Sequence, residues 1–232
     1  MLTIQFDTIF IYACFVIKLD PTYQAKQYTL NKTFKFRIEL DGTSPKIWRE
    51  FLVSSDTKFY RLHHIIQIVM GWENYHMYEF SMDSYRIGKH FEEDGFNGPN
   101  EIIDSKTITI GDVLQAKGQQ LEYLYDFGGY WQHVLTVEMI IPDLAIPFPV
   151  CCAGTLGCPP EDVGGVSGFY DFLRIMEKPK HPEHKETKAW ANSKLAPTDG
   201  RYDSQKFPLE QVNYTLINLD AYIKDWEKKA NP

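Results

Sequence analysis

Basic residues are missing from a long central stretch of this chain. No Lys or Arg occurs in the 56 residues from 118 to 173, whereas seven carboxylates do. A region with charge of one sign favours a cation, a metal ion or a basic partner over a phosphate group. Lys and Arg from elsewhere in the fold could equally cover it, so a purely structural explanation stays open. The whole chain is also acidic, with a formal net charge of −7, which argues against non-specific binding to nucleic acid.

Cysteine is rare, and long apolar runs are absent. Four cysteines in 232 residues do not suit the disulfide framework of a small secreted domain. Residues 2–17 are mostly apolar, but Asp7 interrupts them, no Lys or Arg precedes them, and no small-residue cleavage site follows. The run is also shorter than the ~20 residues that a membrane span needs. We therefore expect a cytoplasmic protein with no signal peptide and no membrane segment, in which residues 1–27 form an N-terminal extension.

The order of apolar patterns places strands first and helices last. Alternation and turn residues predict strands over residues 28–40, 47–53, 77–83, 121–127 and 131–141. Helical spacing predicts helices over residues 59–70, 110–116, 169 onward, 181–190 and 209–226, with Gly71 ending the first. Residues 86–107 and 151–168 are expected to lack regular structure. The fold class is therefore α+β, an antiparallel sheet built from hairpins and packed by one early helix and a C-terminal group of helices, in one domain over residues 28–232.

Three of the four cysteines lie close together, at Cys151, Cys152 and Cys158. Five residues separate Cys152 from Cys158, which is wider than the roughly two to four residues of a usual structural zinc site. A zinc ion held by Cys152, Cys158 and His133 is one hypothesis, and buried free thiols are the alternative. No Lys or Arg lies nearby in the sequence to lower the pKa of the Cys158 thiol, so we do not expect it to act as a nucleophile.

Further candidate binding residues come from the hairpin, the Gly/Pro-rich segment and two isolated histidines: His63, His76, Asp126, Trp131, His133, Glu161 and Asp162. We expect the Asp126 carboxylate to bond backbone amides in the hairpin turn. The indole of Trp131 and the imidazoles could line a pocket, or they could lie in the core with each imidazole hydrogen-bonded. The glycines at 164, 165 and 168 lack the Lys of a phosphate-binding loop, so we expect them to supply turns with positive φ.

Several motifs follow one another along the chain. In order, they are Lys46-Ile47-Trp48-Arg49, Leu62-His63-His64-Ile65-Ile66-Gln67, Met70-Gly71-Trp72 with His76, Tyr125-Asp126-Phe127-Gly128 with Trp131 and His133, Cys158-Pro159-Pro160-Glu161-Asp162-Val163-Gly164-Gly165, His181-Pro182-Glu183-His184, and Phe207-Pro208-Leu209-Glu210-Gln211-Val212-Asn213. In this order, from about residue 28 to about residue 219, the chain resembles the plasmid pRiA4b open-reading-frame-three-like family. The Cys-Pro-Pro-Glu-Asp run with its double glycine is the most specific part of the resemblance.

The resemblance implies a compact α+β domain of bacteria and archaea, often encoded on plasmids or beside insertion elements. It implies no activity, substrate or cofactor, so no catalytic residue can be transferred to this chain. Two positions depart from the family pattern. Gly129 stands where the family commonly has Asp, and Thr155-Leu156 stand where a basic residue is common. Both departures weaken the case for a site shared with the family.

The sequence favours a non-catalytic binding or interaction module, because no catalytic triad, phosphate loop or convincing set of metal ligands is visible in it. Its surface would be the hairpin with the Gly/Pro-rich segment, and its partner a protein or a basic, cationic ligand. One alternative is a metal-dependent hydrolase that uses Cys152, Cys158 and His133 as ligands and Glu161 or Asp162 as base. A second alternative is a nucleic-acid-binding accessory protein of a mobile element.

Overall fold

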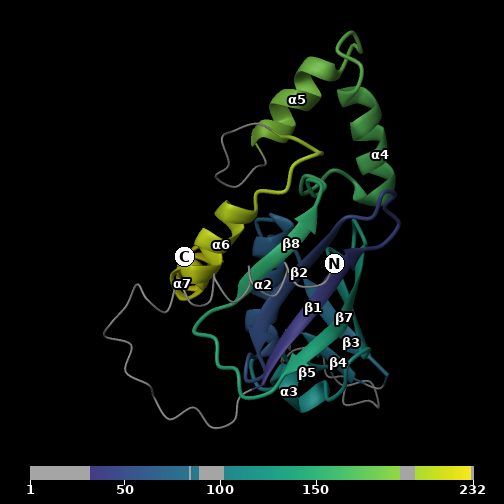
Figure 1. Ribbon diagram of the computed structural model, residues 1–232. Coiled ribbons are helices and arrows are strands. Elements are labelled where there is room, and N and C mark those ends of the chain that lie inside the picture. Colours follow the sequence, from purple (N-terminus) through teal and green to yellow (C-terminus); the bar gives the residue numbers. More distant parts are fainter. Residues whose placement is uncertain (1–31, 84, 89–101, 194–201, 231–232) are drawn as a thin grey trace, which may run out of the picture.

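The computed structural model describes residues 32–83, 85–88, 102–193 and 202–230 (Figure 1). Its strands are β1 (Thr33–Leu40), β2 (Trp48–Ser54), β3 (Tyr78–Met82), β4 (Tyr85–Gly88), β5 (Ile103–Asp104), β6 (Gln120–Tyr125), β7 (Trp131–Ile141) and β8 (Val150–Thr155). They form one sheet in the order β5-β4-β3-β6-β7-β1-β2-β8. Three hairpins, β1–β2, β3–β4 and β6–β7, supply six of the eight strands, and each neighbouring pair is antiparallel except β4–β5. The predicted α+β fold is confirmed, with that one parallel pair as an addition.

One face of the sheet carries the core because its apolar residues recur at every second position. On β1 the buried side chains are Phe34, Phe36, Ile38 and Leu40, and on β7 the buried face includes His133 as well as leucine and valine. Helix α2 (Phe59–Met70) lies where the sequence predicts it and buries ten of its twelve residues. Gly71 ends it with φ of 82° and donates its N–H to the Gln67 carbonyl, as expected of a left-handed cap.

The opposite face of the sheet carries ion pairs. Lys35 lies 2.6 Å from a carboxylate oxygen of Glu50 and 2.9 Å from one of Glu138. Arg37 bonds Glu39 and Glu50 and stacks over Trp48 at 4.0 Å. A lysine from β1 therefore covers part of the acidic central stretch, as the structural explanation requires.

The described residues form six helices: α2, α3 (Ile110–Val113), α4 (Gly165–Met176), α5 (His184–Ser193), α6 (Leu209–Ile217) and α7 (Leu219–Ala230). Figure 1 shows α6 and α7 beside α2 and the edge strand β8, while α4 and α5 form a separate pair beyond one end of the sheet. No helix in the described parts of the chain is long and apolar enough to cross a membrane. The cytoplasmic location stays a prediction.

Four sequence predictions of secondary structure are wrong in part. The segment expected to be irregular from residue 151 begins with strand β8, which pairs with β2. The side chain of Asn213 on α6 bonds both the N–H and the carbonyl of Cys151, at 2.8 and 2.9 Å, and so completes the free edge of β8. The expected loop at 86–107 includes strand residues, α4 begins at Gly165 instead of Phe169, and Asn218 divides the expected C-terminal helix into two. Residues 1–27 lie outside the described residues, so the N-terminal extension stays a prediction.

Candidate functional site

The Cys-Pro-Pro-Glu-Asp segment after β8 fastens the loop that follows α2 to the β6–β7 hairpin. The indole Nε1 of Trp72, directly after the helix cap, donates to the carbonyl of Pro159 at 3.0 Å. The same indole stacks on Tyr125 with a centroid separation of 5.1 Å and also contacts the rings of Trp131 and His133. Three segments far apart in the sequence therefore share one buried aromatic cluster.

Glu161 is a buried carboxylate that organises the loop after α2. Its Oε2 accepts the N–H of Glu73 at 2.5 Å, and its Oε1 accepts the N–H of Tyr75 and the hydroxyl of Tyr125. Burial, together with the neighbouring Glu161 carboxylate, raises the pKa of Tyr125 well above its ordinary value, so the phenol stays protonated and donates. Because Glu161 is only 2% exposed and accepts three hydrogen bonds, its arrangement is that of a structural anchor.

His76 lies between two carboxylates at the surface. Its Nε2 is 2.8 Å from Oδ1 of Asp162, and its Nδ1 is 3.7 Å from Oδ1 of Asp126. The side chains of His76 and Asp162 are 32% and 39% exposed, whereas that of Asp126 is 15% exposed. We call these three residues the acid–histidine cluster. It joins three of the predicted site residues from three loops.

The hairpin turn holds Asp126 in place. Asp126 has φ of 55°, and its Oδ1 accepts the N–H of Gly128 at 3.0 Å, which confirms the predicted contact with a turn amide. The carbonyl of Met77 accepts the N–H of Asp126 at 3.0 Å, so the residue that follows His76 also fixes the turn.

The double glycine has two physical reasons. Gly164 and Gly165 have φ of 92° and 70°, which confirms the positive φ predicted for them. A Cβ on Gly165 would also overlap the carbonyl oxygen of Gly129, so the loop contacts the hairpin there backbone against backbone. For Gly168 the prediction was wrong: it lies inside α4 without positive φ, and a Cβ there would overlap the carbonyl of Val163.

His63, Trp131 and His133 lie in the core and are not part of the acid–histidine cluster. Each is at most 1% exposed. His63 contacts Tyr123 OH at 2.8 Å through Nδ1 and Asn74 Oδ1 at 2.7 Å through Nε2, and burial holds its pKa well below the ordinary value. Burial likewise lowers the pKa of His133 to about 4. The sequence analysis offered a hydrogen-bonded position in the core as one interpretation of these histidines. His63 occupies such a position, because both of its ring nitrogens have a partner.

The structure does not assemble the hypothetical zinc ligands. Among the described residues, no group of three or more His, Cys, Asp or Glu side chains is placed to hold a metal ion. The thiol of Cys152 points to the Val150 carbonyl, and His133 Nδ1 contacts the Tyr123 carbonyl at 3.2 Å. The three cysteines are free thiols, which was the alternative interpretation.

A cation does lie beside Cys158 in the fold, although none is near it in the sequence. Arg49 on β2 places its Nη2 2.9 Å from the Cys158 sulfur, although more than a hundred residues separate the two in the sequence. Desolvation nevertheless has the larger influence, and the pKa of Cys158 is raised from its ordinary value in spite of the guanidinium. The thiol therefore has no activation of the kind that nucleophilic cysteines show.

The chain matches the plasmid pRiA4b ORF-3-like proteins over residues 32–211. It belongs to this family. The pRiA4b ORF-3-like chain is 34% identical over 197 residues to the uncharacterized protein y4hQ of Sinorhizobium fredii (strain NBRC 101917 / NGR234), covering 84% of this chain and 95% of that protein. It is also similar to the crystal structure of MM3350 from Methanosarcina mazei Go1, a protein of unknown function, with a TM-score of 0.66 and 30% identity over 78% of this chain and 98% of the other.

Residues from several of the motifs of this pRiA4b ORF-3-like protein contact one another. The sequence did not single out Arg49, Glu73 or Phe207, yet Arg49 stacks on Phe207 at 4.0 Å and the backbone N–H of Glu73 donates to the Glu161 carboxylate. Their only signal was membership of the motifs or closeness to one. The motifs thus describe mainly a packed junction, and the acid–histidine cluster is the part of that junction that reaches the surface.

Proposed function

We propose that this protein is a non-catalytic binding module that recognises a basic segment of a protein partner at the acid–histidine cluster. The observation that carries the proposal is the placement of Asp126 and Asp162 on either side of the partly exposed His76. Both carboxylates belong to the stretch of the chain that contains no Lys or Arg. Carboxylates at a partly exposed position pair well with Arg or Lys of a partner.

Exposed apolar side chains lie next to the cluster residues in the sequence, and they also support binding of a basic segment. Tyr75 and Met77 adjoin His76, and Phe127 and Tyr130 belong to the Asp126 turn; all four are among the large exposed hydrophobic residues. The N–H of Tyr130 bonds the Asp126 carbonyl at 2.6 Å, so this ring belongs to the turn that holds the carboxylate. Aromatic rings attract Arg and Lys through cation–π contacts and are enriched at interfaces. A basic, Arg-containing segment satisfies both features.

The biological setting in the proposal is the host or mobile-element machinery that acts with plasmids. Support for it is limited to the family name, which comes from a plasmid. An acidic chain of net charge −7 favours a basic protein partner over direct contact with nucleic acid.

A peptide-binding measurement tests the proposal. A fluorescent Arg-rich octapeptide is titrated with the wild-type protein and with the double variant Asp126→Asn, Asp162→Asn. Asn tolerates positive φ, so the variant removes charge while keeping both turns. We expect affinity to fall at least about fivefold, as the loss of two ion pairs predicts.

The matched control is Asp143→Asn, because Asp143 is an exposed aspartate of the same Lys- and Arg-free stretch and also has positive φ. It should leave the affinity unchanged. Equal losses in the control and the double variant would reduce the effect to net charge and sink the proposal. The proposal would also be wrong if an acidic octapeptide or single-stranded DNA bound the wild-type protein as tightly as the Arg-rich peptide does.

A further inference from the structure

His76 lies between the two carboxylates that the proposed function assigns to a basic partner. Its Nε2 is 2.8 Å from Oδ1 of Asp162, and its Nδ1 is 3.7 Å from Oδ1 of Asp126. The imidazole is partly exposed, so protons from the solvent reach it. Both ring nitrogens therefore lie beside the groups that an Arg or Lys of the partner has to reach.

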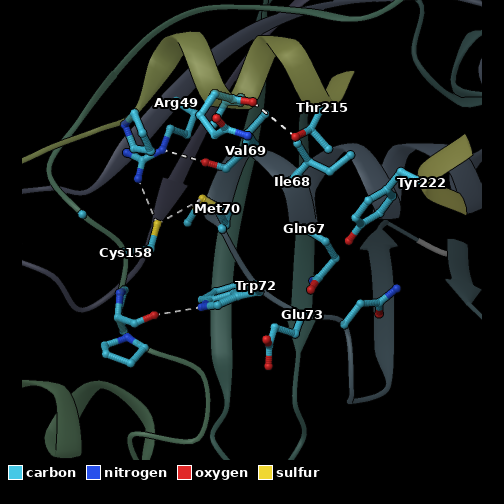
Figure 2. Close-up of a pocket in the computed structure, with 18 of the residues that line it drawn as sticks. Arg49, Gln67, Ile68, Val69, Met70, Trp72, Glu73, Cys158, Thr215 and Tyr222 are labelled. Atoms are coloured by element: carbon cyan, nitrogen blue, oxygen red, sulfur yellow. Dashed lines mark hydrogen bonds between the residues drawn. The ribbon is translucent and has the colours of Figure 1, made fainter. Parts of the chain in front are cut away.

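The backbone positions this histidine. Figure 2, a view of the pocket between α2, α6 and α7, shows the indole of Trp72 bonded to the carbonyl of Pro159, at the start of the loop that carries His76. The N–H groups of Tyr75 and His76 both donate to the hydroxyl of Tyr125, at 3.0 and 3.3 Å. The loop therefore cannot move away from the acid–histidine cluster without breaking several hydrogen bonds.

Two carboxylates and a neutral phenol surround the imidazole of His76. Asp126 comes from the hairpin turn and Asp162 from the segment before α4. The ring of Tyr125 on β6 lies at 5.8 Å in a T-shaped arrangement. Burial, together with the neighbouring Glu161 carboxylate, raises the pKa of Tyr125, so the phenol keeps its proton. Glu161 itself is buried and already accepts three hydrogen bonds.

Two further charged side chains belong to the surroundings of this loop. Glu73 lies three residues before His76 and lines the pocket. On α7, Lys229 lies near Tyr75 and pairs with Asp225 at 2.7 Å. Within the acid–histidine cluster itself, only the imidazole can gain a positive charge.

Protonation of the imidazole changes the charge of the site. A histidine ordinarily changes its charge between about pH 5 and about pH 8. When His76 is neutral, Asp126 and Asp162 present two negative charges to a partner. When His76 is protonated, it pairs with both carboxylates and cancels one of these charges. An Arg of the partner keeps its own charge at either pH, so it then has to compete with the imidazole.

We propose that His76 places this site under proton control: the neutral imidazole leaves both carboxylates to the basic segment of the partner, and the protonated imidazole takes them over and weakens its binding. This regulation rests on the proposed function, because it acts at the same site. Proton and partner compete for the same two carboxylates. By linkage, each therefore weakens the binding of the other.

A titration at two pH values tests the proposal. The Arg-rich octapeptide, with both termini blocked so that its own charge is constant, is titrated with the full-length protein at about pH 8 and about pH 5.5, at one ionic strength. We expect the affinity to be at least about threefold lower at the lower pH, since protonation cancels one of the two charges in the site. Circular dichroism at both pH values checks that the protein is folded.

Two variants assign the effect to His76. His76→Gln keeps an amide donor beside the carboxylates but stays neutral, so its affinity should be the same at both pH values. His76→Lys is charged at both, so at about pH 8 it should bind as weakly as the wild type does at about pH 5.5. The matched control is His181→Gln, at the partly exposed turn between α4 and α5, which should keep the pH dependence of the wild type.

The buried histidines do not interfere with this comparison. Burial lowers the pKa of His64 and His133 to about 4, and it holds the pKa of His63 well below the ordinary value. All three imidazoles therefore stay neutral at both pH values.

Proton release provides a readout that needs no variant. Since the partner favours the neutral imidazole, binding of the octapeptide near neutral pH should release protons from the wild-type protein. Calorimetric titrations in two buffers with different ionisation enthalpies measure this release, and His76→Gln should show none.

The possible failures are distinguishable from one another. Equal peptide affinity at the two pH values, or binding without proton release, would overturn proton control and leave the proposed function standing if the double Asp126, Asp162 variant still binds more weakly. A pH effect that persists in His76→Gln, or wild-type affinity of His76→Lys at about pH 8, would exclude His76 as the controlling group. The absence of saturable binding at about pH 8 would overturn the proposed function itself, and this regulation with it.

Discussion

The guanidinium of Arg49 lies 2.9 Å from the sulfur of Cys158 and is almost completely buried. Its other N–H groups donate to the carbonyls of Trp48, Val69, Thr155 and Leu156. Four backbone carbonyls and one sulfur thus surround a charge that belongs to one of the family motifs. Because the carbonyls come from β2, α2 and the end of β8 with the residue that follows it, this side chain joins three parts of the fold.

Replacing Arg49 with Lys should destabilise the protein strongly. Lys keeps the charge, but it has three donors on a point-like ammonium and cannot reach five acceptors in a planar fork. We expect the free energy of unfolding in urea to fall by about 2–4 kcal/mol. The control is Arg174→Lys, since Arg174 forms an exposed ion pair with Asp171 and should change stability by less than about 0.5 kcal/mol. Similar small effects at both positions would contradict the joining role of Arg49.

Replacing Gly165 with Ala should cost more than positive φ alone explains. A Cβ at this position would overlap the Gly129 carbonyl, whereas a Cβ on Gly118, which also has positive φ, would meet nothing within 4 Å. We expect Gly118→Ala to lower the free energy of unfolding by about 1 kcal/mol and Gly165→Ala by about 2–4 kcal/mol. Denaturant titrations of the two variants measure the difference. Equal losses would show that the contact between the loop and the hairpin yields without cost.

Stability should fall as the pH drops from about 6.5 towards 4. Burial lowers the pKa of both His64 and His133 to about 4, below the ordinary histidine value of 6.5. Between these pH values the two imidazoles are protonated in the unfolded chain but stay neutral in the folded protein, so a lower pH favours unfolding. Each histidine contributes on the order of 2–3 kcal/mol, fully present above pH 6.5 and lost by about pH 4.

Urea titrations between pH 7.5 and 4.5 measure this loss of stability. The hydrogen bond from the Gly42 N–H lowers the pKa of Asp41, and those from the Thr109 hydroxyl and N–H lower the pKa of Asp112. The stabilisation from these two carboxylates is therefore lost only below this window, as they become protonated. An imidazole NMR signal of His133 that titrated near pH 6.5 in the folded protein would refute the prediction.

The thiols of the folded protein should react slowly at neutral pH. Burial raises the pKa of Cys151 to about 12 and that of Cys152 to about 11, and it raises the pKa of Cys158 as well. A Cys14→Ser variant limits the count to these three thiols. We expect alkylation by iodoacetamide at pH 7.5 to be at least about tenfold slower in the native protein than in urea, because the thiolate is the reacting form. Equal rates in the two conditions would show that desolvation does not protect these thiols.

The limits of sequence reasoning are clearest along β8. Cys151 and Cys152 stand in a Gly-rich stretch whose composition predicts a loop, yet the stretch pairs with β2 and is completed at its free edge by Asn213. The backbone groups of Cys151 at this edge bond a side chain sixty-two positions away, so the sequence around Cys151 contains no pattern that predicts the strand. The single expected helix at 209–226 failed for a related reason, since the apolar spacing continues through the break at Asn218.

The candidate site was foreseen in part. His76, Asp126 and Asp162 were named from the sequence, and the structure brings them together. His63, Trp131 and His133 were named with them and lie in the core. Residue type could not separate the two groups, because an imidazole suits both a buried hydrogen-bonded position and a surface ion pair.

Local patterns along the chain were enough for the α+β class, the β1–β2 and β6–β7 hairpins, helix α2 with its Gly71 cap and the Asp126 turn, because each depends on residues a few positions apart. The acidic stretch of residues 118–173 was also visible as composition. The composition does not show what each carboxylate contacts. Lys35 pairs with Glu138, Glu161 is buried, and Asp126 and Asp162 flank His76; these roles depend on contacts across the sheet and between loops. Long-range packing alone determines these contacts, and it also places Cys158 beside Arg49.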